Sequence, residues 1–248
     1  GVTYDYYLNT LKRKSYDNNG AALKMNVRWD KDYNNAFFHP STNQMYFGKQ
    51  DGTFGSDNVS LDVVGHEFTH SLINSSANLT YRGESGALNE SFADIFGHCV
   101  EVMGKGANWE LFEETFTPGK AGDAMRNMDN PNKSGNTGTE AWLHCPDTYK
   151  GTFWKSTSDA YDEGGVHFNS GVQNYWFYLI TDGGSGTNDA PLNHAFDVKK
   201  IGQTKSEQIA FLALTGYLTT GSDFMASRKA TLLAAEDLHG KNSFEYKQ

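Results

Sequence analysis

The sequence contains little cysteine: only Cys99 and Cys145 occur in 248 residues. Two cysteines are too few for a disulfide scaffold, and these two stand too far apart in sequence to suggest a metal knuckle. A single bridge between them remains open, as does the alternative that Cys99 is a small buried residue on a helix and Cys145 a loop thiol. The cysteine content therefore excludes a disulfide-rich protein and leaves the redox compartment undecided.

Long apolar runs and basic runs are also missing. No apolar stretch approaches the roughly 20 residues that cross a bilayer, and the chain does not start with the basic end and apolar block of a signal peptide. The formal net charge is -9, and no run of Lys or Arg is long enough to follow a phosphate backbone. We therefore expect no membrane partner and no nucleic-acid partner.

The residues that are present suit a protein with a buried core. The chain is 38% hydrophobic and 14% aromatic, which is enough for one large domain or two modest ones. Near the N-terminus, short extended segments at 23–29, 36–38 and 44–47 predict a small sheet. Apolar residues at three- and four-residue steps predict a helix over 3–14 that packs on this sheet.

Helical periodicity dominates from Ser60 onward. Ser60 can cap a helix that carries Asp62 in its first turn, where the helix dipole favours a negative charge. Thr204 and Glu207 have the spacing of a capping box. The glycine-rich stretch 182–186 is expected to be only a connection between helices. Further helices are expected at 85–103, 172–180, 204–218 and 224–238, with long surface loops over 104–162.

The most informative motif is His66-Glu67-Phe68-Thr69-His70. Two histidines four residues apart on a helix present their imidazoles on one face at zinc-binding distance, and the glutamate between them is a candidate general base. Such a motif arises by chance about once in a hundred chains of this length, so it needs support from its context. Glu90, twenty residues after His70, offers the carboxylate that completes a three-ligand zinc site.

The third ligand separates the classes of zinc peptidase. A metzincin needs Gly three residues and His six residues after the second histidine, but this chain has Ile73 and Ser76 there, which excludes that class. A glutamate from a following helix matches the catalytic site of two His and one Glu that leaves a fourth position for water. Asn89 and Asp94 can accept hydrogen bonds from the ring nitrogens that do not bind the metal. The alternative for both is that they are ordinary polar residues on a helix surface.

Three segments together resemble the thermolysin family of zinc endopeptidases: HEFTH, then YRGESGALNESFAD, then EGGVHFNSG. The resemblance runs from Thr3-Tyr4-Asp5-Tyr6-Tyr7 through Asn34-Asn35-Ala36-Phe37 to Leu218-Thr219, which is nearly the whole chain. It implies an α+β fold with a sheet-containing N-terminal lobe at 1–81, a mainly helical C-terminal lobe at 82–248, and the HEFTH helix at the floor of a zinc cleft between them.

The resemblance also implies a chemistry, the hydrolysis of internal peptide bonds by a zinc-activated water. Glu67 is then the base that takes the proton of the water and passes it to the leaving amine. Tyr81 and His167 would donate hydrogen bonds to the oxyanion, with Asp162 orienting the histidine. On the sequence alone, Tyr81 could equally be a core aromatic and His167 a loop histidine.

Substrate-binding residues follow from the same resemblance. Asn35 and Ala36 match edge-strand residues that hold an extended peptide through main-chain hydrogen bonds. Arg126 matches a residue that grips the substrate carbonyl beyond the cut bond, and its alternative is a surface ion pair. An apolar pocket after the scissile bond predicts cleavage before bulky apolar residues such as Leu or Phe. The positions that match this pocket are Val63, Leu111 and Met125.

Acidic residues near the two core helices match the calcium cluster of the family. Crowded carboxylates need a hard cation to offset their repulsion, and Asn108 stands where the family usually has a carboxylate, so we expect one calcium ion. Phe116, Thr117 and Asp123 match a second calcium loop. The carboxylates of the first cluster are Asp62, Glu101, Glu110 and Glu113.

The family implies a larger β-rich segment before Thr3 and a last helix after about Tyr246, so we expect a chain truncated at both ends. It also implies a secreted, extracellular enzyme that is made as a precursor with its own prodomain and acts on polypeptides. An aminopeptidase would need an acidic anchor for a free amine, which the sequence does not identify. An inactive fragment or binding module with this fold remains the other alternative, although Glu67, Tyr81 and His167 are intact.

Overall fold

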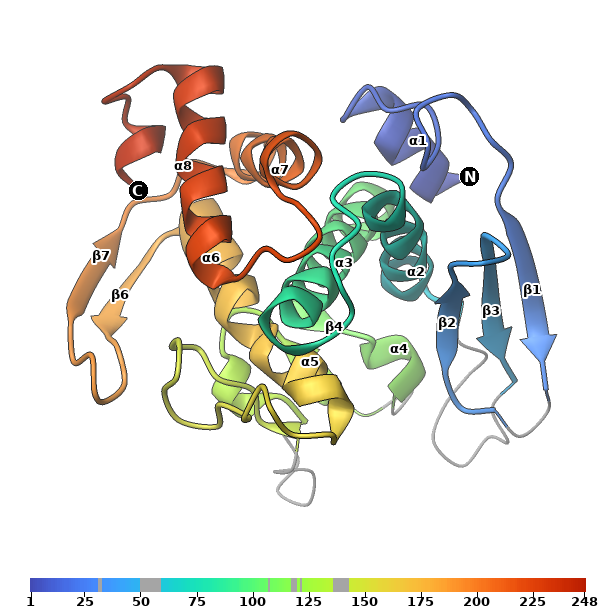
Figure 1. Cartoon of the computed structure of the whole chain (residues 1–248), viewed down its shortest axis with the longest axis horizontal. Coiled ribbons are helices and arrows are strands. Elements are labelled where there is room, and N and C mark those ends of the chain that lie inside the picture. The colour runs from blue at the N-terminus through green and yellow to red at the C-terminus, as the bar shows by residue number, and fades with distance from the viewer. Residues whose placement is uncertain (31–32, 50–58, 107, 117–119, 121, 136–142) are drawn as a thin grey trace.

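A small sheet and a larger body of helices lie on two sides of a central helix pair in the computed structural model (Figure 1). The structure describes residues 1–248 except 31–32, 50–58, 107, 117–119, 121 and 136–142. The fold is α+β, as the sequence predicted. Among the described residues, no helix is both long enough and apolar enough to span a membrane.

The N-terminal part contains the predicted sheet. Strand β3 (Gln44–Gly48) is central, with β1 (Lys24–Trp29) parallel to it and β2 (Ala36–His39) antiparallel to it. Met45 and Phe47 of β3 are buried on the face that packs toward the helices, because alternate residues of a strand share a face. Helix α1 (Val2–Asn9) packs on the central helix pair and ends before Lys14, where the sequence predicted it to end.

Helices α2 (Leu61–Asn74) and α3 (Gly83–Lys105) form the centre of the molecule. They cross closely because Gly65 meets Gly97: a methyl group on Gly65 would lie 2.9 Å from the Cα of Gly97. Ser60 does precede α2, but its hydroxyl donates to Asp62 instead of capping the helix, and Asp62 accepts from the N–H of Val63 at 2.8 Å. The glycine contact allows α2, which carries the HEFTH motif, to lie close against α3.

The C-terminal part is mainly helical, with short strands that the sequence did not predict. The stretch 182–186 was expected to be only a connection, and this was wrong, because Gly184 begins a β-hairpin in register with Val198. The elements after α3 are β4 (Glu110–Leu111), α4 (Glu113–Phe116), β5 (Arg126–Asn127), η1 (Pro131–Lys133), α5 (Asp162–Asn169), α6 (Gly171–Asp182), β6 (Gly184–Thr187), β7 (Ala195–Val198), α7 (Gln203–Leu212), η3 (Ala213–Tyr217), α8 (Phe224–His239) and η4 (Glu245–Lys247).

The predicted capping box of Thr204 and Glu207 does not form. Helix α7 begins one residue earlier, after Gly202, and Glu207 instead accepts a hydrogen bond of 2.9 Å from the hydroxyl of Tyr6. The helix also does not run regularly to Leu218, because its last turn widens into the π-helical segment η3. Tertiary pairing of a buried carboxylate with α1 has overridden a local capping preference.

The two cysteines are both buried and neither forms a disulfide. Cys99 lies inside α3, as the alternative to a bridge suggested, and Cys145 lies near the cleft, where its sulfur is 3.3 Å from the carbonyl oxygen of Leu143. The predicted domain boundary after residue 81 falls between α2 and α3 and stays a prediction.

Candidate metal centre and catalytic cleft

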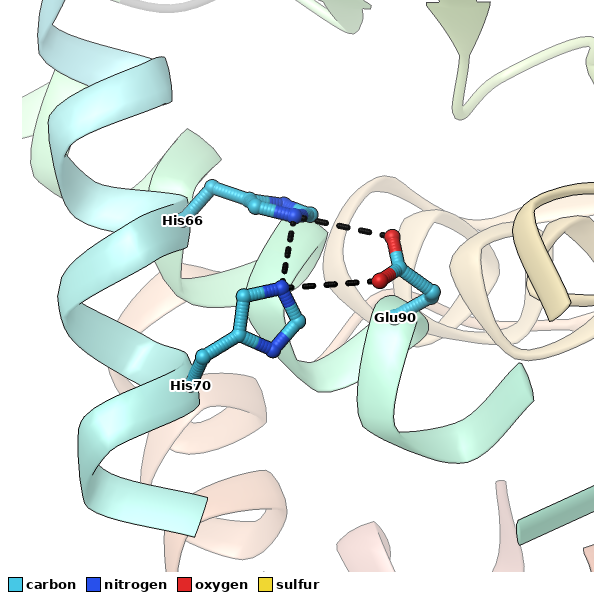
Figure 2. A group of neighbouring side chains, drawn as sticks. All are labelled: His66, His70 and Glu90. Carbon is cyan, nitrogen blue, oxygen red and sulfur yellow. Dashed lines mark hydrogen bonds and ion pairs between the residues drawn. The ribbon is translucent and has the colours of Figure 1, made fainter. Parts of the chain in front are cut away.

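Helices α2 and α3 bring His66, His70 and Glu90 together (Figure 2). The Nε2 atoms of the two histidines are 3.0 Å apart, and each lies 3.5 Å from a different oxygen of Glu90. We call these three residues the His–Glu cluster. The three side chains come from adjacent faces of two helices, as the i,i+4 spacing of the histidines and the position of Glu90 on the next helix predicted.

A second polar side chain contacts the Nδ1 atom of each imidazole, on the side away from Glu90. The Nδ1 atom of His70 lies 2.8 Å from Oδ1 of Asn89, whose amide nitrogen donates to the carbonyl of Leu79. A carbonyl only accepts, so the amide of Asn89 has one orientation and its oxygen must accept from His70. The Nδ1 atom of His66 lies 3.0 Å from a carboxylate oxygen of Asp94. The amide oxygen of Asn89 places the proton of His70 on Nδ1, and the nearby carboxylate favours the same tautomer of His66.

This tautomer makes the His–Glu cluster fit a cation. With both Nδ1 atoms protonated, the two Nε2 atoms are acceptors that face each other at 3.0 Å, and both face a carboxylate. Three acceptors in contact repel one another unless a cation lies among them. The Oε2 atom of Glu90 also finds no hydrogen-bond partner among the described residues, although it is buried. Two imidazoles and one carboxylate form the donor set that zinc takes in catalytic sites.

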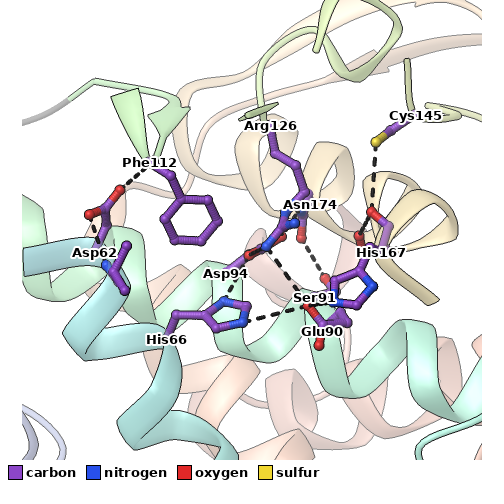
Figure 3. Close-up of polar contacts among 12 residues, drawn as sticks. Asp62, His66, Glu90, Ser91, Asp94, Phe112, Arg126, Cys145, His167 and Asn174 are labelled. Carbon is purple, nitrogen blue, oxygen red and sulfur yellow. Dashed lines mark hydrogen bonds and ion pairs between the residues drawn. The ribbon is translucent and has the colours of Figure 1, made fainter. Parts of the chain in front are cut away.

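Arg126 neutralises the carboxylate behind His66 (Figure 3). Its guanidinium binds both oxygens of Asp94, at 2.8 and 2.7 Å, and the amide of Asn174 donates to the same carboxylate at 2.8 Å. Ser91 in turn donates to Asn174 at 2.7 Å. Asp94 is fully buried, so this network supplies the charge and the donors that a buried carboxylate needs.

Charges around Glu90 hold it ionised. Burial alone would raise the pKa of Glu90, but the positive charges of His167 and Arg126 help to lower its pKa below the usual range. Burial also lowers the pKa of His70 to about 4, so this imidazole is neutral and able to bind a metal at neutral pH.

Glu67 lies in the same cleft and forms no salt bridge with any of the described residues. Burial raises the pKa of Glu67 to about 7, and Glu90 adds to this effect. Its Oε2 atom has no hydrogen-bond partner in the described part of the chain. A carboxyl group with a pKa near neutrality and a free oxygen is suited to accept and return a proton.

Tyr81 and His167 meet on the other side of Glu90. The Tyr81 hydroxyl donates to Glu90 and lies 3.1 Å from Nε2 of His167. Asp162 accepts from both the ring Nδ1 and the backbone N–H of His167, so it fixes the orientation of the ring. Burial lowers the pKa of His167, but Glu90 and Asp162 outweigh burial and raise it above its usual value. The protonated form favoured here is a hydrogen-bond donor toward the cleft.

A turn of left-handed backbone places His167. The four residues from Asp162 to Gly165 all have positive φ, between 49° and 89°. A Cβ on Gly164 would lie 2.5 Å from the carbonyl of Thr157, so only glycine fits there. This turn brings the carboxylate of Asp162 back onto the histidine five residues later, a geometry that ordinary helical backbone does not give.

A cleft of about 1360 Å³ joins these groups to the sheet. Asn35 and Ala36 line it at the start of β2, which is an edge strand of the described sheet, and Val63 and Met125 also line it. Leu111 is fully buried and is not among the lining residues. Arg126 also lines the cleft, but it is buried and paired with Asp94 and does not form a surface ion pair. Sequence reasoning missed several apolar lining residues: Phe112, Thr115, Phe116 and Leu143.

A second group of charges lies at the far end of α2 and α3. Carboxylate oxygens of Asp62, Glu101 and Glu113 come within 4.8 Å of one another, and we call them the carboxylate cluster. Burial, with the charge of Asp62, raises the pKa of Glu101 to about 7. Lys105 lies 2.7 Å from Glu101 and 3.9 Å from Glu113.

The other residues predicted to bind calcium are less clearly placed. Asn108 donates to Glu113 at 2.8 Å, whereas Glu110 is not part of the carboxylate cluster. In the second predicted loop, Asp123 is buried beside Lys120, and Phe116 ends α4. Thr117 lies outside the described residues.

Comparisons with known proteins identify the family of this chain. Residues 1–74 match the family model described as thermolysin metallopeptidase, catalytic domain, and residues 77–248 match thermolysin metallopeptidase, alpha-helical domain. Bacillolysin of Bacillus cereus is 42% identical over 99% of this chain and 40% of its own length. Thermolysin of Alicyclobacillus acidocaldarius is also 42% identical, over 99% of this chain and 41% of its own.

A solved structure shares the fold. The precursor of protealysin, a metalloproteinase from Serratia proteamaculans, superposes with a TM-score of 0.80 at 30% identity, covering 100% of this chain and 72% of that one. The chain spans about two fifths of the length of the curated relatives. With family models matching both its N-terminal and its helical part, the chain belongs to the thermolysin family of metallopeptidases.

Proposed function

We propose that this chain is the catalytic region of a zinc-dependent endopeptidase that hydrolyses internal peptide bonds of proteins. One observation carries the proposal. The two acceptor nitrogens of His66 and His70 and the carboxylate of Glu90 converge in one cleft with Glu67, whose carboxyl group has an unpaired oxygen in the described structure and a pKa near neutrality.

Each residue has a task in this reaction. When bound, zinc would polarise the scissile carbonyl and make the attacking water more acidic. Glu67 accepts the proton of that water and passes it to the leaving amine, a transfer for which a pKa near the working pH is best. Tyr81 and His167 donate hydrogen bonds to the negative charge that develops on the carbonyl oxygen, and one such donor is worth about 3 kcal/mol.

The cleft favours an extended peptide. A peptide would add to the described sheet at the edge strand β2, beside Asn35 and Ala36. The carbonyl of Asn35 accepts from the N–H of Gly48 at 2.9 Å within the sheet, so the outward main-chain groups are those of Ala36. Arg126, which lines the cleft, is the proposed partner of the carbonyl beyond the cut bond. The apolar residues Val63 and Met125 favour bulky apolar side chains such as Leu or Phe after that bond.

The location and maturation of the enzyme follow from its family. Membership in the thermolysin family supports secretion to the extracellular space and synthesis with a prodomain that is removed on maturation. The similarity to a protein described as a precursor supports the same inference. The partners are then polypeptide substrates and the enzyme's own prodomain.

One calcium ion in the carboxylate cluster belongs to the same proposal. Lys105 pairs with one oxygen of Glu101, but the other oxygen of Glu101, one oxygen of Glu113 and the amide oxygen of Asn108 are buried and lack hydrogen-bond partners among the described residues. Oxygen atoms that crowd without donors suit a hard cation. Lys105 already contributes one positive charge at this place, which favours one ion over two.

The test is hydrolysis of an internally quenched peptide with one Gly-Leu bond. The wild type and Glu67→Gln are both loaded with zinc, and the bound metal is measured in each. Removal of the general base should lower kcat by about 10²- to 10⁴-fold at unchanged zinc content, and a chelator should abolish activity in the wild type. A folded, zinc-loaded wild type that cleaves nothing would instead identify an inactive fragment or a binding module with this fold.

A further inference from the structure

We propose that Phe112 determines the specificity of the cleft by limiting the size of the side chain accepted after the cut bond, so that aliphatic residues are preferred over aromatic ones. This inference rests on the proposed endopeptidase function. It begins with the ring itself, which lies between a metal-ligating histidine and the arginine of the substrate site (Figure 3).

The ring of Phe112 fills part of the cleft wall. Its edge contacts the ring of His66, with centroids 5.4 Å apart, and the guanidinium carbon of Arg126 lies 4.8 Å from its centroid. The side chain is 6% exposed, and that small surface faces the cleft beside Met125. An aromatic ring at this place occupies space next to the two groups that flank the residue after the cut bond.

The backbone of Phe112 is held in an uncommon conformation. Its φ is +65°, in the left-handed region that bulky residues rarely adopt because the Cβ then crowds the following carbonyl oxygen. A strained residue persists only where its surroundings fix it, and such residues gather at functional sites. The left-handed backbone turns the ring of Phe112 toward His66.

Hydrogen bonds on both sides fix that conformation. The N–H of Phe112 donates to Asp62, and its carbonyl accepts from the N–H of Thr115 at 3.1 Å and of Phe116 at 2.8 Å. Asp62 is itself anchored at the start of α2. The backbone therefore cannot rotate without breaking these bonds, so the ring is a rigid wall and not an adaptable one.

A rigid aromatic wall selects by volume. A second aromatic ring would need part of the space that Phe112 occupies at the cleft wall, whereas a smaller branched aliphatic side chain would not. Differences of this size in an apolar pocket change kcat/KM by about 10- to 200-fold. Truncation of Phe112 should therefore raise cleavage before Phe more than cleavage before Leu.

The experiment compares two quenched peptides that differ only in Leu or Phe after the cut bond. The measured quantity is the ratio of kcat/KM for the Leu peptide to that for the Phe peptide, which is independent of the active fraction of each preparation. We expect this ratio to fall about tenfold in Phe112→Ala and by less in Phe112→Leu. The leucine variant keeps an apolar side chain in the core, so it still tests the inference if the alanine variant does not fold. Phe168→Leu is the matched control, because Phe168 is an aromatic lining residue with 8% exposure on the His167 side.

The outcomes separate the two proposals. A ratio that falls in the Phe112 variants and stays within about twofold in Phe168→Leu supports the inference. Equal ratios in wild type and both Phe112 variants, or an equal change in the control, overturn it while leaving the endopeptidase function in place. If zinc-loaded wild type cleaves neither peptide, the proposed function fails, and the inference fails with it.

Discussion

The His–Glu cluster lies on α2 and α3, and the carboxylate cluster adds Glu113 of α4 to residues of the same two helices, but the two clusters differ in how their polar atoms are paired. Behind the His–Glu cluster, Asp94 and Asn89 hold the imidazoles, and each is held in turn by further donors or acceptors. In the carboxylate cluster, buried oxygens of Glu101 and Glu113 lack hydrogen-bond partners in the described structure. Protein contacts hold the side chains of the first cluster, whereas the second is proposed to need a cation to offset the repulsion of its carboxylates.

The largest effect should come from breaking the network behind the His–Glu cluster. In Asp94→Ala, Arg126 keeps its charge in a buried position but loses its main partner. Removal of one member of a buried ion pair costs about 3–5 kcal/mol, so the free energy of unfolding in urea should fall by that amount. The pair is also predicted to hold His66, so zinc affinity should fall as well.

The control for Asp94→Ala is a carboxylate at the surface. Asp5 is half exposed and near the N-terminus, and its replacement by Ala should change the free energy of unfolding by less than about 0.5 kcal/mol. A loss below about 1 kcal/mol in Asp94→Ala would mean that the network is not the rigid support that its contacts indicate.

A pH dependence should come from His98, which lies on α3 between the two clusters. The ring stacks on Trp109 at 4.2 Å, and neither ring nitrogen has a hydrogen-bond partner among the described residues. Burial lowers the pKa of His98 from 6.5 to about 4. Below pH 6.5 the unfolded chain therefore binds a proton that the folded chain does not, and stability falls as the pH falls, by up to about 3 kcal/mol at pH 4.

His98→Phe isolates this contribution. Phenylalanine can stack on Trp109 but does not titrate, so the difference in unfolding free energy between variant and wild type should grow as the pH falls from 6.5 to 4. Both proteins are measured with a chelator, so that loss of zinc does not enter the comparison. A difference that is constant over this range would show that His98 is protonated in the folded state or does not titrate there.

Calcium should reveal the dependence of the carboxylate cluster on a cation. Calcium at about 100 times its Kd should stabilise the folded protein by about 2.7 kcal/mol, measured as a rise in Tm of the zinc-loaded protein. Lys105→Met removes the ammonium group that competes for Glu101, so the variant should be less stable without calcium and should bind calcium more tightly. Lys199→Met, which changes an exposed ion pair, is the control. A Tm that does not respond to calcium would remove the calcium proposal.

How much the sequence could predict differs between these regions. The spacing of His66, His70 and Glu90 predicted their meeting, because helical geometry converts spacing into position. The burial of Arg126 against Asp94 could not be predicted, because β5 and α3 are joined only by tertiary packing. For the same reason, local signals mispredicted the partner of Glu207.

Backbone conformation was the other limit. No residue type in the sequence signals that Phe112 adopts positive φ, because the cause is a hydrogen bond to Asp62 from fifty residues away. The pair Gly164-Gly165 could have signalled an unusual turn before His167, since glycine tolerates positive φ. The glycines at 183 and 184 likewise marked the β6–β7 hairpin, which was predicted as a simple connection.

The smallest effect should come from that left-handed turn at the rim of the His–Glu cluster. Glu163 has a φ of 49°, and a residue with a long side chain is strained there, whereas asparagine adopts this conformation more readily. In the described structure, the one ion pair that could offset this backbone strain is the exposed pair of Glu163 with Arg82 at 3.2 Å, which is worth about 0–1 kcal/mol. Glu163→Asn should therefore raise the free energy of unfolding by roughly 0.5 kcal/mol, and Arg82→Ala measures what loss of the ion pair costs. If Glu163→Asn destabilises the protein by more than Arg82→Ala does, the turn is held by Glu163 itself. The strain would then be part of what positions His167 and not a cost that the asparagine relieves.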